Sequence, residues 1–226
     1  MSALGAPRLH LRTIDSTNER ARALPVTGAP HGTLITASEQ SAGRGRQGRR
    51  WSAPAGQALL MSLILRDPPR LLPLAAAVAV AALAGDGARI KWPNDVQADG
   101  RKVAGILVEG RPQERWAVLG IGFNVAVRLE ELPPELLDTA GTLGLTARDV
   151  EPVLERLLAE LTSWLARDEA AILDAWRARD ALLGCEVRWD GGSGRAAGVD
   201  RDGRLLVDLD DGGRAALDGG EVHLQR

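Results

Sequence analysis

Apolar residues are grouped along the chain in short runs that predict strands in its first half. Alternating or β-branched segments predict strands at residues 8–14 and 33–37. A continuous apolar run at residues 58–65 predicts a strand at the centre of a sheet, where both faces are covered. Residues 102–109 and 115–125 have the pattern of an antiparallel pair. These segments together predict one sheet.

Four other segments have the pattern of helices. Ser16, followed by Glu19 three residues later, has the form of a capping box, so a helix is expected from there to about residue 24. The alanine-rich run at residues 71–83 predicts a buried helix. Apolar residues at three- to four-residue spacing predict an amphipathic helix over residues 150–165, and a further helix is expected at about residues 169–182.

The chain changes character at Gly184, where short apolar runs begin to alternate with glycine-rich turns. Turn signals about every eight residues predict a small antiparallel barrel. Because a unit of this size buries little core, we expect it to lean on the rest of the chain. The sequence therefore predicts two domains, residues 1–182 and 183–226.

Composition narrows the class of protein. The formal net charge of −2 and the isoelectric point of about 6.0 argue against a general nucleic-acid binder, which carries a basic domain. Cys185 is the only cysteine, which excludes an internal disulfide and a cysteine zinc site and fits a reducing cytoplasm. No signal peptide is expected, and the apolar run at residues 71–84 is too short to span about 30 Å of hydrocarbon.

Residues 41–51 are the first candidate for chemistry, because three glycines alternate there with four arginines and Trp51 closes the stretch. Glycine lets main-chain N–H groups approach a ligand closely, and guanidinium forks suit phosphate and carboxylate oxygens. Mutual repulsion of the arginines predicts a loop that an anionic ligand would order. A solvated basic loop and an Arg/Gly RNA-binding tract remain open as alternatives.

Two further candidates follow. Residues 89–92 predict a short strand that leads into Pro93, which places Asn94 and Asp95 just past the strand end; a plain turn is the alternative. A hairpin turn is expected at Asp99-Gly100, and Lys102 then enters an apolar strand. If that lysine is buried, it requires an anionic partner, which a ligand could supply; a surface lysine is the alternative.

The fourth candidate is residues 120–125. Gly120 and Gly122 leave one face of a strand open for a flat ligand, and Asn124 could read an amide or base edge, whereas a tight crossing of the sheet is the alternative. No other chemistry is indicated. The three histidines lack metal-ligand spacing, Ser16 has no general base nearby in the sequence, and there is no phosphate-binding Gly-x-x-x-x-Gly-Lys-Ser/Thr motif.

In the order 43–51, 91–95, 101–109 and 120–125, these stretches resemble the motifs of the biotin protein ligases, and the resemblance covers nearly the whole chain. It implies an α+β fold like that of lipoate ligases and class II synthetases: a mixed, mostly antiparallel sheet flanked by helices, with a small C-terminal SH3-like β-barrel. Many bacterial members carry an N-terminal DNA-binding winged helix, for which few residues precede the strand at 8–14. The resemblance is therefore to the monofunctional class, and we expect no DNA binding.

The resemblance implies an ATP-dependent, AMP-forming ligase. It would make biotinyl-5′-AMP from biotin and ATP, release pyrophosphate, and transfer biotin to one lysine of a biotin carboxyl carrier protein. Since the biotin carboxylate and the α-phosphate repel each other, the site must be cationic and dry. Magnesium is expected with ATP, held mostly by phosphates and water, and Asp95 is either a magnesium contact or the base for the acceptor amine.

The resemblance also assigns site residues. Those implied to bind biotin are Ser16, Thr17, Asn18, Gln40, Arg44, Gly45, Arg46, Lys102 and Gly105. Those implied to bind ATP are Arg44, Arg46, Arg49, Trp51, Asn94, Lys102 and Asn124. Those implied to act in catalysis are Lys102, Arg46 and Asp95.

The nearest rival is a lipoate or octanoate ligase or transferase of the same fold. The Arg/Gly stretch, the Lys-Trp-Pro-Asn-Asp stretch and the C-terminal barrel favour biotin over it. Because the family includes monomers and dimers, the sequence leaves the oligomeric state open, a homodimer included. We expect a cytoplasmic enzyme with no membrane partner.

Overall fold

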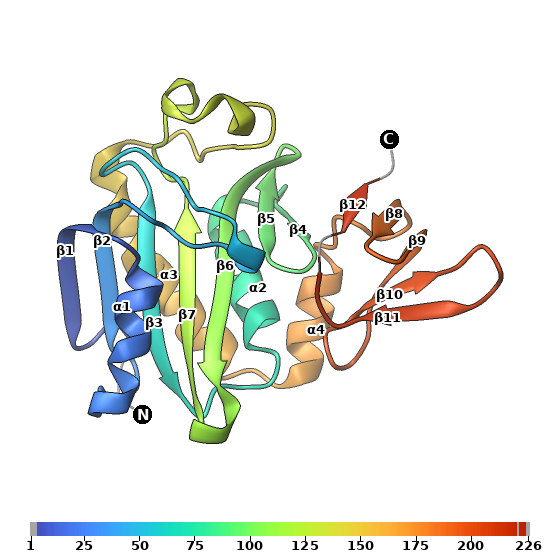
Figure 1. The fold of residues 1–226 in the computed structure, drawn as a ribbon, viewed down its shortest axis with the longest axis horizontal. Helices are drawn as coiled ribbons and strands as arrows, with labels where there is room; N and C mark the ends of the chain where they lie inside the picture. The colour runs from blue at the N-terminus through green and yellow to red at the C-terminus, as the bar shows by residue number, and fades with distance from the viewer. Residues whose placement is uncertain (1–3, 221, 225–226) are drawn as a thin grey trace.

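The computed structural model describes residues 4–220 and 222–224, and its largest element is a seven-stranded sheet (Figure 1). Its strands are β1 (Arg8–Ile14), β2 (Leu34–Gln40), β3 (Leu59–Arg66), β4 (Arg89–Lys91), β5 (Asp95–Ala98), β6 (Arg101–Arg111) and β7 (Trp116–Phe123). They lie in the order β1-β2-β3-β7-β6-β5-β4. β1 and β2 are parallel and the other neighbouring pairs are antiparallel, which confirms the mixed, mostly antiparallel sheet.

Helices cover both faces of this sheet. In Figure 1, α2 (Leu72–Ala84) and α3 (Val150–Leu165) lie behind it and α1 (Thr17–Ala23) lies in front, while α4 (Glu169–Arg177) packs beside α2. Successive side chains of a strand point to opposite faces. Leu63 of β3 therefore joins the main core with α2 and α3, whereas Ile64 joins a second core with Ala21 of α1. Both faces are covered, and this explains the continuous apolar run.

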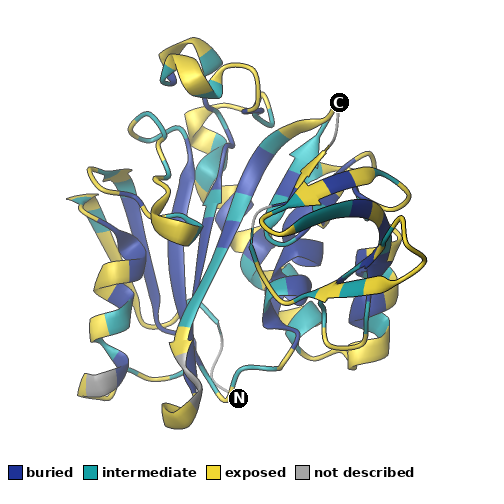
Figure 2. Ribbon diagram, turned by 45° about the vertical axis from the view of Figure 1, so that its right-hand side comes forward, coloured by how far each residue is buried: buried dark blue, intermediate teal, exposed yellow. Residues whose placement is uncertain are grey.

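The C-terminal part forms a five-stranded antiparallel sheet in the order β11-β10-β9-β8-β12. Its strands are β8 (Glu186–Trp189), β9 (Gly192–Val199), β10 (Leu205–Asp208), β11 (Arg214–Leu217) and β12 (His223–Leu224). Val187 and Leu205 belong to the same core as α2, and the Trp92 indole N–H donates to the Gly203 carbonyl at 3.1 Å. Figure 2 shows buried central strands in the large sheet and an exposed outer surface on the small one. The domain boundary at residue 183 stays a prediction.

Short 3₁₀ turns connect these elements at η1 (Pro25–Thr27), η2 (Arg46–Gly48), η3 (Pro112–Glu114), η4 (Leu129–Glu131), η5 (Pro134–Leu136) and η6 (Ala147–Asp149). The first predicted helix is confirmed, and the Ser16 hydroxyl accepts the Glu19 N–H at its N-cap. The prediction of a helix over 169–182 is wrong in its end, because α4 stops at Arg177. The chain beyond it pairs with β4, where Ile90 N–H donates to the Arg179 carbonyl at 2.7 Å and Ala181 N–H donates to the Ile90 carbonyl at 3.0 Å. No helix of the described residues is long and apolar enough to cross a membrane.

Candidate active site

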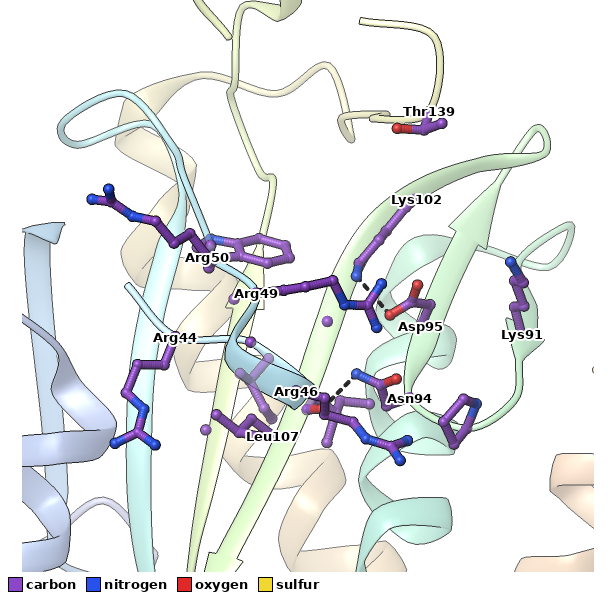
Figure 3. Close-up of a pocket in the computed structure, with 18 of the residues that line it drawn as sticks. Arg44, Arg46, Arg49, Arg50, Lys91, Asn94, Asp95, Lys102, Leu107 and Thr139 are labelled. Atoms are coloured by element: carbon purple, nitrogen blue, oxygen red, sulfur yellow. Dashed lines mark hydrogen bonds and ion pairs between the residues drawn. The ribbon is translucent and has the colours of Figure 1, made fainter. Parts of the chain in front are cut away.

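A cleft of about 440 Å³ opens on the α1 side of the sheet (Figure 3). It is lined by the start of α1, the Arg/Gly loop, the β4–β5–β6 region and β7. Leu136, Asp138 and Thr139 also line it, as do Gly220, Val222 and His223 at the end of the barrel. The cleft brings together thirteen of the fourteen predicted site residues: Ser16, Thr17, Asn18, Gln40, Arg44, Gly45, Arg46, Arg49, Trp51, Asn94, Asp95, Lys102 and Gly105.

Asn124 is the exception, because it does not line the cleft as the structure describes it. Its side chain is buried, and its Nδ2 donates to the Gly141 carbonyl at 2.9 Å. The backbone of Asn124 is also occupied, since its N–H donates to the Val103 carbonyl at 2.8 Å. Asn124 therefore ties β7 to the segment that follows residue 140, and its predicted contact with the nucleotide stays a prediction.

One end of the cleft is a buried polar cluster at the N-terminus of α1. Thr17 N–H donates to Gln40 Oε1 at 2.7 Å, and Ser62 Oγ lies 2.8 Å from Thr17 Oγ1 and 2.6 Å from Asn18 Oδ1. Asn18 Nδ2 donates to Glu109 Oε2 at 2.9 Å. Ser16, Thr17, Asn18 and Ser62 are all at least 96% buried, with relative exposures of 2%, 4%, 4% and 0%.

The directions of these hydrogen bonds decide what the cluster offers a ligand. Because Asn18 Nδ2 is committed to Glu109, Asn18 Oδ1 is an acceptor and takes the single hydroxyl proton of Ser62. The Thr17 hydroxyl proton then points inward, to Ser62 or to Gln40 Oε1 at 3.1 Å. Thr17 Oγ1 therefore presents a lone pair to the cleft, whereas Ser16 O–H and Gln40 Nε2 remain as donors.

The floor of the cleft is made of glycine. Gly105 of β6 and Gly122 of β7 are paired across the two strands. A Cβ at Gly122 would lie 2.4 Å from Trp51 Cε2, and one at Gly105 would lie 2.9 Å from Trp51 Cζ3. The expectation that this face stands open for a flat ligand is wrong in this structure, because the Trp51 indole covers Gly122. At Gly120 the Asn18 amide takes the same place.

Lys102 and Asp95 form an ion pair beside this floor. Lys102 Nζ lies 2.6 Å from Asp95 Oδ1 and 5.6 Å from the centroid of the Trp51 ring. The Lys102 side chain is 30% exposed and that of Asp95 19%. The anionic partner that a lysine in an apolar strand requires is thus supplied by the chain itself. Asn94 stands next to this pair, and its Nδ2 donates to the Ile106 carbonyl of β6 at 2.9 Å.

The Arg/Gly loop is folded back on itself above the cleft. Gly45 N–H donates to the Arg49 carbonyl at 2.7 Å and Trp51 N–H to the Gly43 carbonyl at 3.0 Å. Figure 3 shows Arg46 and Arg49 extending toward Asn94 and Asp95, whereas Arg44 points away from them. The Arg44 guanidinium binds two carboxylates, Glu19 and, at 3.0 Å, Glu109. The loop therefore places its arginines on two different sides.

This combination of a folded Arg/Gly loop, a glycine floor and a lysine on β6 agrees with the sequence comparison, in which residues 10–125 match the Biotin/lipoate A/B protein ligase family. The chain belongs to this family. It is 37% identical to a biotin–[acetyl-CoA-carboxylase] ligase of Mycobacterium tuberculosis, over 93% of this chain and 86% of the relative. It is 34% identical to a bifunctional ligase/repressor BirA of Bacillus spizizenii, over 92% of this chain and 71% of the relative.

Solved structures of the family agree with the fold. The biotin protein ligase from Aquifex aeolicus in complex with biotin and ATP superposes with a TM-score of 0.80 at 28% sequence identity, and the match covers 98% of this chain and 99% of that one. The match extends over both sheets of the present chain, so it confirms the C-terminal barrel as well as the larger sheet.

Several residues that line this ligase-family cleft or lie beneath it could not be recognised from the sequence. Ser62 lies in the run 58–65, which is predicted as a continuous apolar strand without regard to its one serine. A lone serine in such a run is a signal for a buried hydrogen bond. Glu109 was noted as a strand end but not as the acceptor beneath Asn18. Other lining residues reach the cleft through tertiary structure, for which a single sequence holds no local signal: Leu136, Asp138, Thr139 and the barrel residues Gly220, Val222 and His223.

Proposed function

We propose that this chain activates biotin with ATP to biotinyl-5′-AMP, releases pyrophosphate, and transfers biotin to a lysine of a biotin carboxyl carrier protein. The named relatives are biotin ligases, and the Aquifex structure holds biotin and ATP. The proposed partners are therefore biotin, ATP and the carrier protein. Absence of DNA binding, oligomeric state and cellular location stay predictions.

The buried polar cluster at α1 is the observation that favours biotin over lipoate or octanoate. Biotin ends in a cyclic urea, with two N–H donors and one carbonyl acceptor. Thr17 Oγ1 offers an acceptor, while Ser16 O–H and Gln40 Nε2 offer donors, so the two patterns are complementary. A dithiolane or a methyl end would bury these groups without partners, at a cost of about 1–3 kcal/mol for each one.

The first step is governed by charge, because a carboxylate oxygen must attack the α-phosphorus of ATP. Arg46 and Arg49 extend over the cleft near Lys102, which supplies a third cation. We infer that Lys102 leaves Asp95 to lie between the biotin carboxylate and the α-phosphate, where it offsets their repulsion. The P–O bond to pyrophosphate breaks as the new P–O bond forms, which requires positioning and electrostatics but no nucleophile from the enzyme.

In the second step the acceptor amine attacks the acyl carbon and AMP leaves. A lysine amine has an ordinary pKa of about 10.4, so it must lose a proton before it can attack. Asp95 stands at the reacting end of the cleft, and once Lys102 has turned to the adenylate its carboxylate is in place to accept that proton or to orient the amine. We propose this role for Asp95 in transfer.

Magnesium fits the same end of the cleft. Mg²⁺ in nucleotide sites is bound by phosphates, waters and one or two carboxylates. The described residues contain no group of three or more histidine, cysteine or carboxylate side chains that could hold a metal by themselves, but two carboxylates, Asp95 and Asp138, line the cleft. Mg²⁺ entering with ATP would neutralise charge on the phosphates, and Asp95 would be its protein contact as the alternative to its role with the acceptor amine.

The test is exchange of labelled pyrophosphate into ATP, with biotin, lipoate and octanoate compared at equal concentration. Only biotin is expected to support exchange. The isosteric variant Thr17→Val removes one acceptor from the polar cluster, and we expect it to raise the KM for biotin by about tenfold, the usual effect of one lost hydrogen bond in a buried site. Exchange with lipoate or octanoate but not with biotin would refute the proposal in favour of the rival of the same fold.

A further inference from the structure

Glu109, near the end of β6, connects two parts of the cleft that are far apart in the sequence. Its Oε2 accepts from Asn18 Nδ2 at 2.9 Å, and its Oε1 accepts from Arg44 Nη2 at 3.0 Å and from Arg22 Nη1 at 3.4 Å. The Glu109 side chain is 19% exposed, so these contacts are partly shielded from water. One carboxylate thus joins α1, the Arg/Gly loop and the central sheet.

The first connection sets the orientation of the polar cluster. Because Glu109 accepts from the Asn18 amide nitrogen, Asn18 must turn its oxygen toward Ser62. That in turn holds the hydroxyl protons of Ser62 and Thr17 inward. Without the Glu109 carboxylate the amide could rotate by half a turn, present Nδ2 to Ser62, and reverse the donor and acceptor pattern offered to a ligand.

The second connection holds the Arg/Gly loop down. Arg44 lies near the beginning of the loop, and its main chain forms an isolated antiparallel β-bridge with that of Arg50. Its guanidinium is fastened by Glu109 and also by Glu19 of α1. The Glu19 carboxylate contacts Arg22 and Arg44, whereas the Glu109 carboxylate also accepts from Asn18. Among the described residues, Glu109 is therefore the one of these two carboxylates that reaches the polar cluster.

We propose that Glu109 is a positioning residue that couples occupancy of the polar cluster to closure of the Arg/Gly loop. The inference rests on the proposed function. A ligand ring seated on Thr17 favours the Asn18 orientation that Glu109 holds, and the fixed carboxylate favours the closed position of Arg44. Coupling of this kind is reciprocal, so a closed loop also raises affinity for the ring.

The experiment uses biotinamide, which keeps the cyclic urea but has no carboxylate to attract the arginines directly. Tryptic cleavage after the loop arginines reports the open population of the loop, because cleavage follows opening. In the wild type, saturating biotinamide is expected to slow this cleavage by about fivefold or more, the lower range of ordinary coupling. Glu109→Gln is expected to abolish the protection and to raise the KM for biotin in pyrophosphate exchange by about tenfold, with kcat changed by less than about twofold.

Glu19→Gln is the matched control, since it removes the other carboxylate that holds Arg44. It is expected to speed tryptic cleavage of the loop in the free protein. The protection ratio, which is the cleavage rate without biotinamide divided by the rate with it, and the KM for biotin should stay as in the wild type. A Glu109→Gln protein that keeps the wild-type protection ratio would overturn the inference and leave the proposed function standing. Absence of biotin-dependent exchange in the wild type would overturn both.

Glu109→Asp covers the case in which Glu109→Gln fails to fold, as judged by its melting curve. This variant keeps the charge but is one methylene shorter, so it cannot reach both Asn18 and Arg44. Reduced protection together with a raised KM for biotin would support the inference. A change in either quantity alone would contradict it.

Discussion

Gly122→Ala tests whether the glycine floor exists to receive the Trp51 indole. The added Cβ would lie 2.4 Å from Trp51 Cε2 and 2.7 Å from Trp51 Cδ2 and Nε1. Favourable contacts between carbon atoms lie at about 3.5–4.0 Å, so the ring must move by about 1 Å or more. Since Trp51 closes the Arg/Gly loop through its backbone bond to Gly43, moving the ring moves the loop.

The size of the effect follows from overpacking. One methyl group in a filled site costs about 1–3 kcal/mol, which corresponds to a factor of about 5 to 150 in the population of the closed loop. The strand itself gains, because alanine is favoured over glycine in a strand interior by about 0.5–1 kcal/mol. We therefore expect slower biotin-dependent pyrophosphate exchange and faster tryptic cleavage of the loop, by at least about fivefold each, with a melting temperature that does not fall.

Gly87→Ala is the matched control, since a Cβ there meets no described atom within 4 Å and its backbone is not in the left-handed region. It is expected to leave exchange and cleavage as in the wild type. If Gly122→Ala were indistinguishable from Gly87→Ala in both assays, the indole would not need the space above Gly122 and the reasoning would be refuted. A melting temperature of Gly122→Ala clearly below that of the wild type would also refute the reasoning, because the loss of exchange would then reflect unfolding.

Two further predictions concern ionised groups. Lys102→Ala is expected to abolish pyrophosphate exchange while its melting curve stays near normal. The control variant Lys102→Arg keeps the charge opposite Asp95, so its melting curve should be unchanged. Near-normal exchange by Lys102→Ala would remove Lys102 from the mechanism. Burial raises the pKa of Asp180 above its ordinary value of 3.8. The folded state then binds more protons than the unfolded state above pH 3.8, so stability falls as pH rises toward the folded pKa. The free energy of unfolding of Asp180→Asn, relative to that of the wild type, should therefore increase from about pH 4 to about pH 7. Urea titrations in which this difference does not change with pH would contradict the prediction.

Much of the fold could be predicted from the sequence because it depends on local patterns. The continuous apolar run at β3 indicates a strand that is buried on both faces. The alanine-rich run at α2 indicates a helix that is buried on nearly all sides. The end of α4 could not be predicted in this way. Residues beyond Arg177 keep helical composition, but their backbone groups are used by Ile90 of β4, which is a tertiary interaction with no local signal.

The candidate site shows the same division. The resemblance to the ligase motifs assigned Ser16, Lys102 and Gly105 to one site, and the structure places all three in one cleft, but the resemblance did not reveal that Asp95 is the partner of Lys102. That pairing depends on the irregular register of β5 against β6, where a shift between Val96 and Gln97 interrupts the ladder. It also could not show that the open strand face would be filled by Trp51, since the loop and the floor are distant in sequence.

The loop arginines give the clearest case of residues that look alike in sequence and differ in structure. Arg44 is neutralised by Glu19 and Glu109, and Arg50 Nη2 donates to the Ser41 carbonyl at 2.6 Å, so these two stabilise the loop itself. Arg49 extends toward the Lys102–Asp95 pair, and Arg46 extends past Asn94 next to it (Figure 3). We propose that Arg46, Arg49 and Lys102 form the cationic clamp, two guanidiniums and one ammonium, while the predicted contacts of Arg44 with biotin and ATP stay predictions. Guanidinium forks hold phosphate oxygens in a fixed plane, while an ammonium on a flexible stem can follow a moving charge. This division suits a reaction in which the phosphates are held still and the carboxylate approaches them.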